Sequence, residues 1–284
     1  MTEAVRAHIE EKVGLVQAIE VIGGGCIANA SRVATGAGDC FVKWGNASVA
    51  VTFEAEAAGL KALAAANTSL IIPTVISCDA TIGCLILEWV DTESKSASFS
   101  RAFGQALAHL HRHEGKDYGF DQDNFIGRTP QYNDWRSSWP AFFREMRLVP
   151  QVTMARKANL WQDAWDLALE RLYQRLGDML PDQPERSILH GDLWAGNYIV
   201  GVGGKAVLID PACYYGHRET DLAMTELFGG FDRDFYAAYR EAWPLTSGYE
   251  ERRSIYNLYH LINHLNLFGS GYASGITSVL KSFA

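Results

Sequence analysis

The sequence predicts an α+β fold with two lobes, a small antiparallel β-sheet carrying one main helix and a larger, mostly α-helical lobe. Three observations support this. Apolar segments of strand length dominate residues 1–90. Beyond a polar segment at residues 91–98, the apolar period lengthens from two residues to about 3.6. A β-hairpin at residues 187–210 then carries acidic and amide side chains. We therefore expect a first lobe at 1–90 and a second at 91–284.

Bulk properties exclude several classes of protein. The 284 residues are 48% hydrophobic and 20% charged, which is typical of a globular chain with a sizeable core. The net charge of −8 and the absence of a Lys/Arg cluster argue against nucleic-acid binding. No N-terminal signal peptide is expected, and apolar stretches such as 82–90 are too short for a bilayer, so we expect a cytoplasmic protein without membrane contact. Five irregularly spaced cysteines suggest neither a disulfide framework nor a zinc ribbon.

A short amphipathic helix is expected at residues 3–13, followed by a glycine-rich hairpin between strands at 18–22 and 31–35. Three consecutive glycines form the tip of this hairpin, namely Gly23, Gly24 and Gly25. Glycines let the main chain approach phosphate groups closely and expose backbone N–H donors. An ordinary flexible turn would have the same composition, so the glycines alone decide nothing.

The next strand, 40–44, contains Lys43 among apolar and aromatic residues, where an unpaired lysine is costly. A helix expected at 53–66 follows, with Glu54 and Glu56 in its first turn, where the helix dipole favours acidic residues. We expect Glu56 to pair with Lys43, with Glu54 as the alternative partner. A glycine-rich hairpin, a strand lysine and a helix glutamate, in this order, form the phosphate-clamping half of a kinase.

Two more strands, at 71–77 and 82–90, complete the predicted sheet. The second strand ends in Glu88, Trp89 and Val90, just before the polar segment. Because flat ligands bind in interlobe clefts, we expect these residues at the nucleotide base, with the backbone of Glu88 and Val90 facing the adenine edge.

Helical periodicity dominates the second lobe. Helices are expected at 99–111, 135–147, 160–179, 220–227, 235–243 and 249–268, with a loop at 118–133. We expect His111 and His113 at a solvated helix end. His260 and His264 have the spacing of a zinc pair, but without a third ligand packing is the favoured interpretation.

The hairpin at 187–210 carries the chemistry. Asp192 and Asn197 lie five residues apart, and Asp192 and Asp210 eighteen, which is the spacing of a phosphoryl-transfer catalytic loop. Asp192 would accept the proton of the acceptor hydroxyl, while Asn197 and Asp210 offer the oxygen ligands that Mg²⁺ prefers. A surface hairpin with polar tips is the alternative. Asp221 follows as either a buried brace of the catalytic-loop backbone or an N-terminal helix charge.

The ordered motifs GGGCIANA, FVKW, FEAEAAGL, LILEWV, LHGDLWAGN and IDPACYYGHRETDLAMTELFGGF closely resemble the fructosamine-3-kinase (ketosamine kinase) family. This family belongs to the aminoglycoside-phosphotransferase-like branch of the protein-kinase-like fold. The resemblance covers nearly the whole chain. One difference from protein kinases is Pro211-Ala212 in place of Phe-Gly, so no phosphorylation-controlled activation loop is expected.

The resemblance implies ATP-dependent phosphorylation of a ketosamine, a fructosyl- or ribulosyl-amine on a small amine or a protein lysine. It implies Asp192 as the base, Asn197 and Asp210 on Mg²⁺, Lys43 on the phosphates and Glu56 aligning Lys43. Adjacency to these elements suggests four substrate contacts, namely Trp194, Tyr215, His217 and Glu219. A thiol at Cys26, close to phosphates, is a hypothetical redox-sensitive group.

Two other functions stay open at this point. In the first, the chain is a kinase whose acceptor is another amino-sugar or hydroxylated amine, such as an aminoglycoside. In the second, the chain is a nucleotide-binding pseudokinase that acts as a scaffold. A pseudokinase usually lacks a catalytic group, whereas this sequence has Lys43, Asp192, Asn197 and Asp210 together. Oligomeric state and the natural acceptor are not determined by the sequence.

Overall fold

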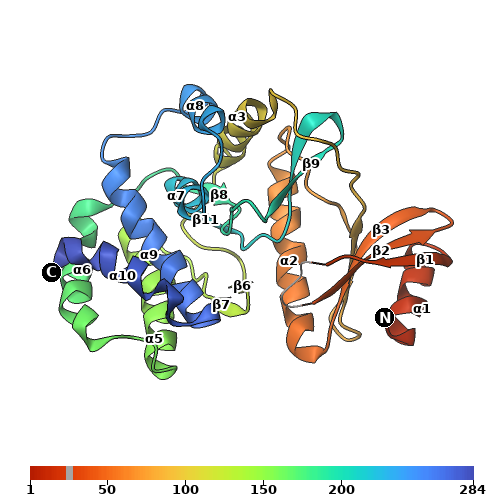
Figure 1. Ribbon diagram of the computed structural model, residues 1–284, viewed down its shortest axis with the longest axis horizontal. Coiled ribbons are helices and arrows are strands. Elements are labelled where there is room, and N and C mark those ends of the chain that lie inside the picture. Colours follow the sequence, from red (N-terminus) through yellow and green to blue (C-terminus); the bar gives the residue numbers. More distant parts are fainter. Residues whose placement is uncertain (24–27) are drawn as a thin grey trace.

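The structure is a computed structural model that describes residues 1–23 and 28–284, and it has two lobes (Figure 1). The sheet lobe is a five-stranded antiparallel sheet in the order β1-β2-β3-β5-β4 with two helices. Its elements are α1 (Glu3–Lys12), β1 (Val16–Val21), β2 (Asn29–Thr35), β3 (Gly38–Trp44), α2 (Ala47–Ala65), β4 (Val75–Asp79) and β5 (Cys84–Glu88). The predicted α+β fold with a small antiparallel sheet is confirmed.

The two helices cover opposite faces of this sheet, because successive side chains of β5 alternate between the faces. Cys84 and Ile86 pack in one apolar cluster with Val5 and Ile9 of α1. Leu85 and Leu87 pack in another cluster with residues of α2 such as Phe53, Ala57 and Leu60. Lys43 stands directly opposite Leu85 in the pairing of β3 with β5, so it lies on the face covered by α2.

The predicted start of the long helix was wrong. Helix α2 begins at Ala47, six residues earlier than expected, because Asn46 caps it and accepts a hydrogen bond from the Ser48 backbone N–H at 3.2 Å. Glu54 and Glu56 therefore lie in later turns, and the dipole of the first turn does not explain their position.

The helical lobe contains the remaining elements. They are α3 (Phe99–His111), β6 (Asn124–Ile126), β7 (Thr129–Gln131), α4 (Trp139–Phe142), η1 (Phe143–Leu148), α5 (Val149–Lys157), η2 (Asp163–Trp165), α6 (Asp166–Met179), β8 (Ser187–Leu189), β9 (Tyr198–Gly201), η3 (Val202–Gly204), β10 (Lys205–Leu208), β11 (Tyr214–Gly216), α7 (Glu219–Leu227), α8 (Arg233–Ala242), α9 (Tyr249–Phe268), η4 (Ser270–Tyr272), α10 (Ala273–Leu280) and η5 (Lys281–Phe283). The helix expected at 135–147 continues to residue 157, and the expected loop at 118–133 contains the hairpin β6–β7.

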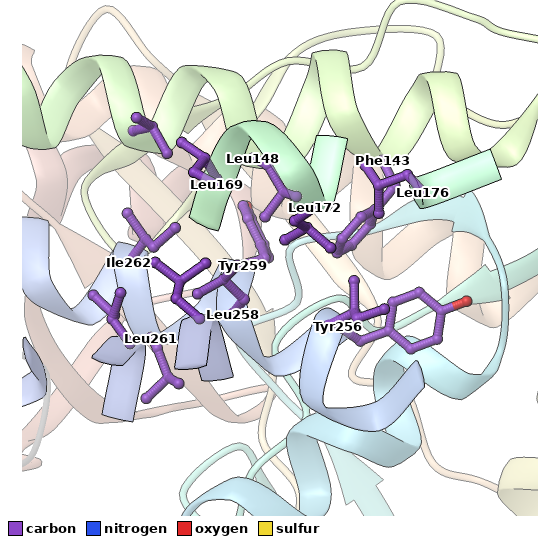
Figure 2. Close-up of a cluster of buried hydrophobic side chains, with 14 of the residues drawn as sticks. Phe143, Leu148, Leu169, Leu172, Leu176, Tyr256, Leu258, Tyr259, Leu261 and Ile262 are labelled. Carbon is purple, nitrogen blue, oxygen red and sulfur yellow. The ribbon is translucent and has the colours of Figure 1, made fainter. Parts of the chain in front are cut away.

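The core of this lobe surrounds α9. Figure 2 shows Leu258 and Ile262 of α9 beside Leu169 and Leu172 of α6, and Leu148 of η1 joins the same cluster. Burying such side chains contributes about 1.5–3 kcal/mol each, so this cluster is a main source of the lobe's stability. No helix of the described residues has the length and hydropathy to cross a membrane.

The hairpin β9–β10 connects the two lobes. Ile71, between α2 and β4, donates from its backbone N–H to the Ala206 carbonyl at 2.9 Å and accepts from the Leu208 N–H at 3.0 Å. On the other side of the hairpin, Thr92 of the interlobe segment bridges to Gly201. The expected strand at 71–77 is therefore regular only from residue 75, since its first residues bond to the helical lobe instead.

Candidate active site

Two pairs of strands hold the catalytic loop, and one of them is the hairpin predicted from the sequence. β9 pairs with β10, and β8 pairs with β11, so residues 190–197 form a loop between two anchored strands. Asn197 donates from Nδ2 to the backbone oxygen of Asp192 at 2.8 Å and to its Oδ2 at 3.2 Å. The Ile209 N–H donates to the Asn197 carbonyl at 3.1 Å, so Asp210 begins right beside this loop.

Asp210 has φ +54°, in the left-handed region that a non-glycine residue rarely adopts. Such backbone strain of about 1–3 kcal/mol persists only where the surroundings impose it, and it is concentrated at functional sites.

Lys43 joins the two lobes. Its ammonium lies 2.8 and 3.0 Å from the two Glu56 carboxylate oxygens and also forms a direct ion pair with Asp210. Lys43 and Glu56 are 14% and 13% exposed, whereas Asp210 is 50% exposed and faces solvent. Burial opposes the charge of the ammonium, but the carboxylates of Glu56 and Asp210 outweigh it and raise the pKa of Lys43 above its usual value. Glu56, rather than Glu54, is the partner of Lys43.

Asp221 binds the backbone of the catalytic loop, as one of the two interpretations of the sequence predicted. Its carboxylate is buried and accepts the backbone N–H groups of His190 at 2.7 Å and Gly191 at 2.9 Å. His111 approaches the same carboxylate at 3.2 Å through Nε2. Burial alone would raise the pKa of Asp221, but the hydrogen bond from His111 and the backbone donors outweigh this effect and lower it.

The expectation that His111 is solvated was wrong. It is fully buried at the end of α3, between Asp221 and the Tyr239 hydroxyl, which lies 2.8 Å from Nδ1. Tertiary packing of α3 against α8 places this helix end in the interior. A helix-terminal histidine next to an arginine gives no sequence signal for such burial.

His190 makes two hydrogen bonds within the site that the sequence did not indicate. Its Nε2 lies 2.9 Å from the Ile209 carbonyl, which can only accept, so this nitrogen carries the proton. Nδ1 then accepts the Asp192 N–H at 3.3 Å. Burial lowers the pKa of His190 and favours this neutral form. The ring therefore ties the backbone of Asp192 to the residue before Asp210.

The carboxyl group of Asp192 has a raised pKa of about 7, mainly because this half-buried group is largely removed from water; the hydrogen bond from Asn197 opposes the shift and the charge of Asp210 adds to it. A carboxylate with a pKa near neutral pH is suited to accepting a proton.

Asn197 and Asp210 have the chemistry of a magnesium site. Both hydrogen bonds of the Asn197 side chain use Nδ2, which leaves its Oδ1 as a ligand atom, and the Asp210 carboxylate already faces a cation, the Lys43 ammonium. Among the described residues no group of three or more His, Cys, Asp or Glu side chains could hold a metal. Mg²⁺ does not need one, because it commonly takes one or two protein oxygens and completes its shell with phosphates and water.

The residues expected around the nucleotide are only partly described. Gly23 lies beyond β1, where the Ile22 N–H donates to the Ala30 carbonyl at 2.9 Å; Gly24, Gly25 and Cys26 lie outside the described residues. At the end of β5, the Glu88 carboxylate accepts the Thr74 hydroxyl at 2.7 Å, and the Glu88 backbone N–H donates to the Thr74 carbonyl at 2.8 Å, so this N–H already has a partner within the sheet lobe.

Trp89 and Val90 follow Glu88 at the start of the interlobe segment. The Trp89 indole donates to Asp91 at 2.9 Å, and the guanidinium of Arg32 stacks over its ring at 4.6 Å. The strand position of Arg32 contained no signal for this contact.

The four suggested substrate residues separate into two pairs. Trp194 is 41% exposed and its ring lies over Gly196, where an added Cβ would come within 2.4 Å of it. Tyr215 is half-buried and stacks on Trp135 at 6.1 Å.

The structure does not support the other pair. Glu219 is fully buried and both its oxygens accept from Arg252, at 2.7 and 2.8 Å. His217 is buried against the Tyr256 hydroxyl, 2.7 Å from its Nδ1. Adjacency in sequence was misleading, because both residues lie where the chain turns into the interior to begin α7.

Known proteins resemble this chain both in sequence and in structure. The family model for fructosamine kinase matches residues 1–284. A probable ketoamine kinase of Synechocystis sp. is 41% identical over 270 residues, 94% of this chain and 90% of that protein. A chloroplastic protein-ribulosamine 3-kinase of Arabidopsis thaliana is 37% identical over 283 residues, 96% of this chain and 85% of that protein.

Solved structures agree. One from Thermobifida fusca, described as a "putative fructosamine-3-kinase", superposes with a TM-score of 0.90 at 31% identity, covering 99% of both chains. An ADP-bound aminoglycoside phosphotransferase reaches a TM-score of 0.68 at 14% identity over 99% of this chain and 98% of that one, a likeness of fold alone. A match over the full length, with relatives near 40% identity, is decisive: the chain belongs to the fructosamine kinase family.

Proposed function

We propose that this chain is an ATP-dependent kinase that phosphorylates a sugar hydroxyl of ketosamines, such as fructosamines or ribulosamines on small amines or protein lysines. The observation that supports it most is the ion-paired group of Lys43, Glu56 and Asp210 across the two lobes, beside a loop that presents Asp192 and Asn197. The names of the Synechocystis and Arabidopsis relatives support the acceptor class.

In this proposal Asp192 accepts the proton of the acceptor hydroxyl. The freed oxygen forms a bond to the γ-phosphorus of ATP while the bond from that phosphorus to the β–γ bridging oxygen breaks, and ADP leaves. Lys43 binds the nucleotide phosphates, and Glu56 holds Lys43 in place. Mg²⁺, held by Asn197 and Asp210, would neutralise charge on the phosphates.

The lobe at residues 1–90 is the nucleotide-binding part of this proposal, and residues 91–284 bind the acceptor. Gly23, Gly24 and Gly25 cover the phosphates, while Glu88, Trp89 and Val90 contact the base. Trp194 and Tyr215 are the substrate contacts that we retain, because their aromatic rings are at least partly exposed.

One experiment tests the proposal. ADP release is measured with fructosyl-lysine, ribulosyl-lysine, free sugars and aminoglycosides as acceptors. We expect turnover with the ketosamines, and Asp192→Asn should abolish it while ADP binding, followed by calorimetry, stays close to that of the unmodified chain. Turnover retained by Asp192→Asn would remove this residue from the base role, and turnover with aminoglycosides alone would overturn the acceptor class.

A further inference from the structure

The hairpin β6–β7 presents two buried amide side chains at one level. Asn124 of β6 stands opposite Gln131 of β7 in the strand pairing. They are 3% and 1% exposed, although the hairpin comes from a segment rich in glycine, proline and charge. Buried amides are costly unless hydrogen-bonded, so their partners indicate what the hairpin supports.

These partners lie two and three residues after Asp210. Gln131 donates from Nε2 to the Ala212 carbonyl at 3.0 Å, and Asn124 donates from Nδ2 to the Cys213 carbonyl at 2.7 Å. The two amides also bond to each other, Gln131 Nε2 to Asn124 Oδ1 at 2.8 Å. Tyr259 of α9 donates its hydroxyl to Gln131 Oε1 at 2.6 Å, which sets the orientation of that amide.

The catalytic loop also bonds to this segment. The Ala212 N–H donates to the His190 carbonyl at 2.8 Å, and Pro211 has no N–H to place. The Ile209 backbone is bonded through both its N–H and its carbonyl. Asp210, in its left-handed conformation, therefore follows a residue bonded to the loop of Asp192 and precedes residues bonded to that loop and to the two amides.

We propose that Asn124 and Gln131 are positioning residues for Asp210, holding its carboxylate in the metal-binding orientation without a regulatory switch. This rests on the proposed function, in which Asp210 binds Mg²⁺. The hairpin also lies against α2, the helix that carries Glu56. One short element of the helical lobe thus contacts both the helix that carries Glu56 and the segment that follows Asp210, the two acidic partners of Lys43.

The test uses Gln131→Glu, which keeps the size of the side chain and the acceptor for Tyr259 but replaces the donor to the Ala212 carbonyl by an oxygen. Losing a buried hydrogen bond of this kind should weaken the metal site roughly tenfold. Two readouts are taken: the Mg²⁺ concentration for half-maximal ketosamine turnover, and the affinity for Mn²⁺ with ADP bound, measured by electron paramagnetic resonance. Both should shift together, with a smaller change in the KM of the ketosamine.

Gln151→Glu is the matched control. Gln151 is also 1% exposed, and its amide bonds are to Asn263 and Asn266, at 3.1 and 2.7 Å. If the amides only stabilise the fold, both variants will lower the urea midpoint and leave the metal readouts unchanged, and the inference is overturned. Asn124→Asp removes the donor to the Cys213 carbonyl and replaces Gln131→Glu if that variant does not fold.

Asp210→Asn separates this inference from the proposed function. If Asp210→Asn leaves Mn²⁺ affinity and turnover intact, the metal site itself has been misassigned. If Asp210→Asn abolishes both while Gln131→Glu and Asn124→Asp match Gln151→Glu, the metal site stands and only the positioning role fails.

Discussion

The hydrogen bonds from the catalytic loop to Asp221 allow us to predict how much stability is lost when its carboxylate is replaced. Asp221→Asn keeps one oxygen and replaces the other by an amide donor. Of the three donors that the carboxylate accepts, from His190, Gly191 and His111, at least one will then face another donor. A hydrogen bond to a charged group contributes about 1.5–3 kcal/mol, and the smaller cost of burying a neutral amide offsets part of its loss. We expect the free energy of unfolding to fall by about 2 kcal/mol.

A loss of this size leaves the chain folded, since domains of this kind are stable by about 5–15 kcal/mol. Because the lost bond holds the catalytic loop, kcat should fall by roughly ten- to a hundredfold, at about 1.4 kcal/mol for each factor of ten. Urea unfolding at pH 7 and ketosamine turnover measure the two effects. Asp166→Asn is the control, since this carboxylate is 43% exposed while accepting the Trp161 indole N–H at 2.8 Å. If Asp221→Asn and Asp166→Asn destabilise the chain equally, the inference that Asp221 holds the catalytic loop is refuted.

Three further outcomes follow from the same geometry. Gly191→Ala should abolish turnover, because φ of Gly191 is +84° and an added Cβ would lie 2.0 Å from a backbone oxygen. Gly177→Ala, in open space on α6, is the control and should be neutral or stabilising. Similar behaviour of the two variants in thermal unfolding and turnover would contradict this prediction. Burial lowers the pKa of His260 to about 3, so the unfolded state binds a proton that the folded state does not, and stability should fall by about 1.4 kcal/mol per pH unit below pH 6.5 for this group. Urea midpoints between pH 7 and 5 measure this slope, and His260→Gln should flatten it; an unchanged slope would exclude this histidine. Glu56→Gln should raise the KM for ATP about tenfold, as expected when a charged partner is lost, while Glu54→Gln should not; equal KM values would show that the ion pair does not order the nucleotide site.

Features that depend on a short segment of the sequence were predicted correctly, whereas the burial of individual side chains was not. The strand that carries Lys43 and the hairpin of Asn197 and Asp210 were predicted, because each depends on alternation or on spacing within a short segment. The sequence left two interpretations of Asp221 open, and its contact with the His190 backbone, 31 residues away, decided for the brace. The solvated environment assigned to His111 was wrong, and the burial of Glu219 was not foreseen, because burial depends on distant elements that pack over the residue.

The sequence by itself determined the alternation of the strands, the helical period of the second lobe and the spacing of Asp192, Asn197 and Asp210 along one hairpin. These properties are local, since side-chain direction follows from backbone period. Only the tertiary structure decided that Lys43 meets Asp210 across the lobes and that Asn124 and Gln131 hold the segment after it. Those contacts join residues 81 or more positions apart, and the packing of whole elements, rather than any local preference, brings them together.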